Sequence, residues 1–120
     1  MRPAFAALIA ALTLPFAAHA QNVAQGQGAV LRGLDKTDAK VSELEIENGG
    51  EVFFGTLSVR MTECRYPDGD AVAEAYAYLV IRDLARGRDM FSGWMLASSP
   101  ALNALDHPRI DVWVIRCRTS

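Results

Sequence analysis

The chain has 120 residues, with 12 basic and 14 acidic side chains and a formal net charge of −2. A mildly acidic chain without a basic patch does not suit nucleic acid or an anionic membrane surface, because both are bound by clusters of lysine and arginine. The length predicts one domain with a modest hydrophobic core. The composition therefore indicates a small globular domain whose partner is neither nucleic acid nor lipid.

Residues 1–20 have the pattern of a cleaved signal peptide. Arg2 provides a short positive region, an apolar run follows at residues 4–14, and residues 18–20 (Ala-His-Ala) form a small-residue cleavage site. We expect a mature chain that begins at Gln21 and lies in the periplasm. The sequence has no cysteine beside the cleavage site for a lipid anchor, and no later apolar run reaches the roughly 18 residues of a membrane span.

Strand patterns begin after a polar segment rich in glycine and glutamine, residues 21–28, which we expect to be a flexible lead-in. Over residues 29–118 apolar and polar residues alternate in short runs, most clearly at Leu57, Val59 and Met61. Turn sequences such as Asn-Gly-Gly and Pro-Asp-Gly separate these runs. The pattern predicts a single, mainly β domain, a compact antiparallel sandwich or barrel of six to seven strands.

One short helix is expected near residues 99–106. Ser98 or Ser99 can cap its first turn, Pro100 suits that turn, and Pro108 prevents its continuation. The apolar run that follows, residues 111–118, predicts a central strand that is covered on both faces.

The mature chain contains two cysteines, Cys64 and Cys117. In an oxidising compartment, an even number of cysteines in a small domain predicts a disulfide. Cys64, however, falls in register with the polar face of its strand. Either a bulge shifts the register there, or the disulfide joins strand ends instead of crossing the core.

Six short motifs, spread over residues 29–118, together resemble a known family. They are Gly33-Leu34-Asp35-Lys36, Phe54-Gly55-Thr56-Leu57, Phe91-Ser92-Gly93-Trp94-Met95, Ser98-Ser99-Pro100-Ala101-Leu102, His107-Pro108 and Asp111-Val112-Trp113. The chain is similar to the uncharacterised exported proteins of alphaproteobacteria grouped as domain of unknown function 2155. The resemblance implies export and a single small domain, and it transfers no catalytic residue.

The residues around the predicted helix also permit an enzymatic hypothesis, a small serine-type hydrolase. Ser98 or Ser99 would be the nucleophile, His107 the base, and Asp106 or Asp111 the acid that orients the base. The Gly-x-Ser-x-Gly turn of many such enzymes is absent, and the same serines are natural helix caps. We therefore favour a protein that is not an enzyme. One histidine with scattered carboxylates does not predict a metal site, and no cofactor is expected.

A binding role is the leading hypothesis, and it depends on Trp94. Phe91, Trp94, Met95 and Leu96 supply more apolar surface than one short strand should bury. Exposed, they would form a patch suited to a partner protein. Trp113 is instead expected in the core, on the side of its strand that faces the disulfide. The sequence thus predicts a periplasmic binding module with an envelope protein as its partner.

Overall fold

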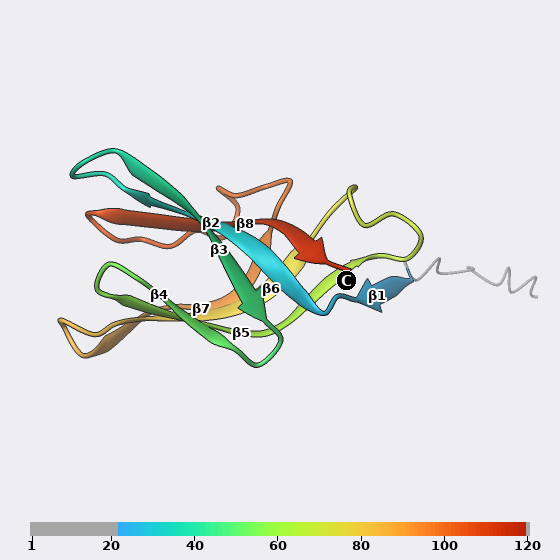
Figure 1. The fold of residues 1–120 in the computed structure, drawn as a ribbon, viewed down its shortest axis with the longest axis horizontal. Coiled ribbons are helices and arrows are strands. Elements are labelled where there is room, and N and C mark those ends of the chain that lie inside the picture. The colour runs from blue at the N-terminus through green and yellow to red at the C-terminus, as the bar shows by residue number, and fades with distance from the viewer. Residues whose placement is uncertain (1–21, 120) are drawn as a thin grey trace, which may run out of the picture.

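The structure, a computed structural model, describes residues 22–119, which form eight β-strands and no helix (Figure 1). The strands are β1 (Val23–Gln25), β2 (Gly28–Asp35), β3 (Lys40–Glu47), β4 (Glu51–Phe54), β5 (Leu57–Pro67), β6 (Tyr76–Asp83), β7 (Arg88–Leu96) and β8 (Ile110–Arg118). The predicted signal peptide, residues 1–20, and the predicted mature N-terminus at Gln21 lie outside the described residues.

All strand pairs are antiparallel and fall into two sheets. Sheet A has the order β1-β5-β6-β7, and β4 also pairs with β5. Sheet B has the order β3-β2-β8. Figure 1 shows the sheets as two layers, with β2 and β8 in one and β4, β5 and β7 in the other. The predicted β-sandwich is therefore confirmed, with eight strands where six or seven were expected.

The core lies between the two sheets and consists of alternate residues of the strands. Leu57, Val59 and Met61 of β5 point inward, as their alternation predicts, and each is at most 1% exposed. Leu31 of β2 and Val114 of β8 join the same buried cluster from sheet B. Burying an aliphatic side chain of this size stabilises by roughly 1.5–3 kcal/mol, so these contacts hold the sheets together.

A disulfide between Cys64 and Cys117 crosses the core and ties β5 of sheet A to β8 of sheet B. The pairing of β5 with β6 shifts by one residue between Met61 and Cys64, which is a β-bulge. The extra residue turns Cys64 from the polar face to the inner face, where it is fully buried. Of the two sequence-based alternatives, the bulge is confirmed.

β8 differs from its prediction in two ways. It pairs with β2 alone within the described residues, so it is an edge strand and not the central strand that we expected. It also bulges at Ile115, because Leu31 pairs with Val114 and the preceding residue of β2 pairs with Arg116. Past the bulge Cys117 faces inward, whereas Trp113 lies half-buried on the outer face. The prediction that Trp113 packs on the disulfide side is therefore wrong.

The predicted flexible lead-in, residues 21–28, is ordered in its described part. Residues Val23–Gln25 form β1 against the end of β5, with Val23 opposite Pro67. The backbone N–H of Gly26 donates to the carbonyl of Cys64 at 2.7 Å. β1 therefore extends sheet A. Strand pairing uses the backbone N–H and C=O groups, so a segment of polar side chains can also form a strand.

Candidate functional site

The segment between β7 and β8, residues 97–109, is called here the sealing loop. It runs from the edge of sheet A to the edge of sheet B, and Leu105 and His107 within it are 6% and 5% exposed. The predicted helix over residues 99–106 is absent. A single turn remains, closed by a hydrogen bond from the N–H of Leu102 to the carbonyl of Ser99 at 3.0 Å. We attribute the loop conformation to the burial of Leu105 in the core, which outweighs the helix propensity of the segment.

Ser98 anchors the start of the sealing loop to Glu74, which precedes β6. The backbone N–H of Ser98 donates to Glu74 Oε1 at 2.9 Å, and the Ser98 hydroxyl donates to Oε2. Burial raises the pKa of Glu74, but hydrogen bonds from Ser98, Ala75 and Ala97 outweigh it, so the pKa lies below its usual value. The Ser98 hydroxyl thus donates to the Glu74 carboxylate and not to His107, the base of the hydrolase hypothesis.

His107 anchors the other end of the loop through both of its ring nitrogens. Nδ1 accepts the backbone N–H groups of Arg109 and Ile110, each at 3.1 Å. An unprotonated Nδ1 places the ring proton on Nε2, which donates to Asp83 Oδ2 at 3.1 Å. Both side chains are buried, so this pair fixes the start of β8 to the end of β6.

Asp83 is buried at the end of β6 and accepts several hydrogen bonds. The backbone N–H groups of Ala85 and Arg86 donate to its Oδ1 at 2.9 and 3.2 Å. Burial raises the pKa of Asp83, but the hydrogen bonds from His107, Arg86 and Ala85 outweigh it and hold the pKa below its usual value. The carboxylate stays ionised because its surroundings supply the donors that water would otherwise provide.

The five candidate residues of the alternative hydrolase hypothesis do not come together as a triad. Ser98 binds Glu74, and Ser99 closes a turn through its carbonyl. His107 binds Asp83 in place of a serine, Asp106 is exposed, and Asp111 pairs with Lys36 at 3.4 Å. Of these residues, Ser98 and His107 act as anchors of the sealing loop. Among residues 22–119 there is also no cluster of three or more His, Cys, Asp or Glu side chains that could hold a metal ion.

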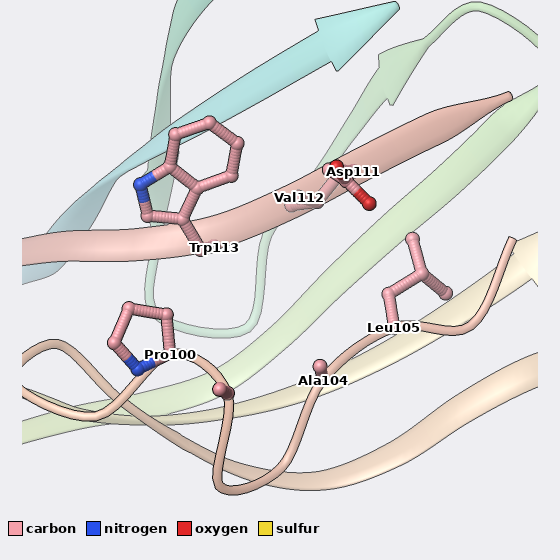
Figure 2. A pocket seen from close by; sticks show the side chains of 7 residues that line it. Pro100, Ala104, Leu105, Asp111, Val112 and Trp113 are labelled. Atoms are coloured by element: carbon pink, nitrogen blue, oxygen red, sulfur yellow. The ribbon is translucent and has the colours of Figure 1, made fainter. Parts of the chain in front are cut away.

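A groove separates the sealing loop from β8 (Figure 2). Its volume is about 270 Å³, and Asp111 is the one charged residue among an otherwise largely apolar lining. The loop forms one wall and β8 the other, with Trp113 and Pro100 on opposite sides in Figure 2. The lining residues are Pro100, Ala101, Ala104, Leu105, Asp111, Val112 and Trp113.

The outer face of sheet A carries an aromatic cluster, called here the Trp94 face. Tyr78 and Trp94 are opposite each other on β6 and β7, and their rings meet edge to face at 5.3 Å. The guanidinium of Arg65 lies over the Trp94 ring, also at 5.3 Å. Beside them is an open groove of about 350 Å³. The Trp94 face comprises Val23, Arg65, Tyr76, Tyr78, Trp94 and Leu96.

The predicted binding residues divide between the two faces of β7. Trp94 and Leu96 are half-buried on the outer face. Phe91 and Met95 point inward, where they are 9% and 3% exposed, so the structure removes them from the predicted surface. The alternation of a strand explains the division, because adjacent side chains point to opposite faces of the sheet.

Sequence reasoning missed the partners that give these residues their roles. Asp83 could have been found, because Ala77, Leu79 and Ile81 set an inward alternation that it continues at the end of β6. No local sequence pattern indicates the roles of Glu74 and Arg65. Glu74 contacts Ser98 through the course of a loop, and Arg65 contacts Trp94 through the pairing of distant strands.

Comparison with known proteins agrees with the family resemblance. A family model described as "Uncharacterized protein conserved in bacteria (DUF2155)" matches residues 29–117. A protein of Rickettsia prowazekii (strain Madrid E), named uncharacterized protein RP359, is 25% identical over 87 residues, which are 70% of this chain and 56% of the Rickettsia protein. The chain thus matches little more than half the length of this curated relative. No solved structure matches the chain significantly.

Proposed function

The chain belongs to the DUF2155 family of uncharacterized bacterial proteins, and from that premise we propose that it is an exported module that binds another protein through the Trp94 face. The partner is a protein of the cell envelope that places an apolar side chain beside Trp94. It also offers a carbonyl or carboxylate oxygen to the guanidinium of Arg65.

One observation carries this proposal, the packing of Trp94 on the solvent side of sheet A. Tyr78 and Arg65 hold the indole ring from two directions, while the groove beside it stays open. A large side chain that is already fixed loses little conformational entropy when a partner binds. Tryptophan, tyrosine and arginine are also the residues in which binding energy concentrates at protein interfaces.

Arg65, the charged residue at the Trp94 ring, can donate a hydrogen bond to a partner. Arg65 pairs with Glu63, yet its side chain remains 46% exposed. A guanidinium has five N–H donors, so one ion pair leaves donors for a partner's oxygen. The Trp94 face therefore combines an apolar surface with a directional polar group, as in the centre of many interfaces.

Export is supported by the disulfide, because structural disulfides form and persist in oxidising compartments. Residues 22–119 contain no helix that is long and apolar enough to cross a membrane. The leader pattern at residues 1–20 supports delivery to the periplasm.

The proposal is tested by comparing Trp94→Ala with Phe53→Ala, in a partner assay on the intact protein. Phe53 is a matched control because it is an aromatic side chain, 61% exposed, on β4 of the same sheet. A partner cross-linked in envelope extract is purified, and its Kd is measured for each variant. We expect Trp94→Ala to raise Kd at least 30-fold, which corresponds to about 2 kcal/mol, the value typical of an interface hot spot. Phe53→Ala should leave Kd unchanged. A folded Trp94→Ala protein that binds the partner with unchanged Kd contradicts the proposal.

A further inference from the structure

The free edges of the two sheets differ in how well they are protected against pairing with another strand. An edge strand exposes unpaired N–H and C=O groups, and proteins protect such edges with charges, bulges, short strands or covering loops. β1 and β4 are short, with 3 and 4 residues. β3 carries charged side chains at Lys40, Glu43, Glu45 and Glu47. These edges therefore resist the addition of a strand.

The edge of β7 is protected by two other means. Its pairing with β6 shifts between Ile81 and Arg82, where Met90 is the extra residue. Further along, Asn103 of the sealing loop donates its side-chain N–H to the carbonyl of Trp94 at 2.8 Å. The bulge and the amide cap occupy the β7 edge from both ends.

The edge of β8 keeps one unprotected stretch, from Asp111 to Val114. The bulge at Ile115 lies beyond it, and the sealing loop stands off from it across the groove of Figure 2. In the described part of the chain, β8 pairs only with β2, so alternate backbone groups of this stretch point away from sheet B. An extended backbone is the chemical group that matches a row of alternating donors and acceptors.

The groove beside this edge also selects the side chain that enters it. Its wall and floor are proline, alanine, leucine, valine and tryptophan, and Asp111 is the one charged lining residue. Lys36 lies 3.4 Å from that carboxylate, so the charge of Asp111 is already matched. An uncharged, apolar side chain is therefore the electrostatic complement of the groove, because a charged one would lose its hydration without gaining a partner.

We propose that the edge of β8 from Asp111 to Val114 binds an extended segment of a partner protein as an added strand of sheet B, with an apolar side chain of that segment in the groove. A volume of about 270 Å³ suits one or two side chains of a single strand. This site is separate from the Trp94 face and does not depend on it.

The test uses a library of eight-residue peptides, soluble through terminal lysines, in which polar and apolar residues alternate. A matched library has aspartate at the apolar positions. Binding to the intact protein is measured by fluorescence anisotropy, and amide hydrogen exchange is followed at residues 111–114. We expect members of the apolar library to bind and to slow exchange at these edge amides, and members of the aspartate library not to bind.

Two substitutions locate the binding. Ala104→Glu places a charge in the groove from an exposed loop position, and Ala73→Glu adds the same charge at an exposed position in the loop before β6. Ala104→Glu should weaken peptide binding at least tenfold, while Ala73→Glu and Trp94→Ala should not change it. The inference is overturned if no peptide binds, if binding leaves exchange at residues 111–114 unchanged, or if Ala104→Glu has no effect. Sedimentation that shows a dimer dissociated by Ala104→Glu would also overturn it, in favour of pairing between copies.

Discussion

Reduction of the Cys64–Cys117 disulfide should remove a large share of the stability of the domain. The bond closes a loop with a sequence separation of 53 residues. The loop-entropy relation converts that length into about 4 kcal/mol at 25 °C. A domain of this size has a free energy of unfolding of roughly 5–10 kcal/mol. The reduced protein should therefore retain only about 1–6 kcal/mol of its free energy of unfolding.

The measurement is urea unfolding of the protein with and without a reducing agent, followed by tryptophan fluorescence. Reduction keeps both sulfur atoms in the core, so the comparison isolates the cross-link, whereas Cys64→Ala combined with Cys117→Ala also removes packing. We expect a loss of about 4 kcal/mol on reduction, or a fall in Tm of roughly 15–30 °C, and a larger loss for the double variant. A loss below about 1 kcal/mol on reduction would refute the reasoning, since it would mean that the reduced chain is already constrained.

Three further predictions concern the sealing loop. Leu105→Ala should lower the free energy of unfolding by about 3 kcal/mol, and Leu102→Ala, at a residue that is 73% exposed, by less than about 0.5 kcal/mol, in the same urea assay. The pKa of Asp83 is lowered by folding, so its contribution to stability is complete above the ordinary carboxyl pKa and is lost as the pH falls through the lowered value. Asp83→Asn should thus destabilise the protein at neutral pH and flatten its acid unfolding curve; an unchanged curve contradicts this. Ser98→Ala should cost about 1 kcal/mol and speed amide exchange at the start of the loop, because Glu74 loses a hydrogen-bond donor.

The local patterns of the sequence were sufficient for the fold class but not for the register of its strands. Leu57, Val59 and Met61 alternate cleanly, so their burial follows from period two alone. Two predictions failed in β8. The face of Trp113 relative to Cys117 depends on a bulge, and the position of β8 at the edge of sheet B depends on strand order. One extra residue at Ile115 places Trp113 and Cys117 on opposite faces, whereas simple alternation would place them on the same face. No residue type in the sequence marks the position of that extra residue.

The sequence patterns around residues 98–108 could not reveal the contacts that these residues make. Ser98, Pro100 and Pro108 do carry signals for a turn, but Leu105 decides between a helix and a loop by entering the core, a tertiary effect. His107 suggested catalysis because it is the sole histidine outside residues 1–20, yet its ring nitrogens are occupied by Asp83 and by backbone N–H groups. The outward position of Trp94 follows from the inward position of its neighbour Met95, because adjacent side chains of a strand point to opposite faces.

The position of β8 in sheet B makes the completion of that sheet depend on a contact between distant parts of the chain. Its partner is β2, more than 70 residues earlier in the chain, and until the last strand arrives sheet B is a bare hairpin of β2 and β3. During synthesis from the N-terminus, the apolar face of this hairpin stays uncovered until β8 has been made. Without the extra residue at Ile115, Cys117 would face away from Cys64, so the native disulfide and the native register of β8 require each other.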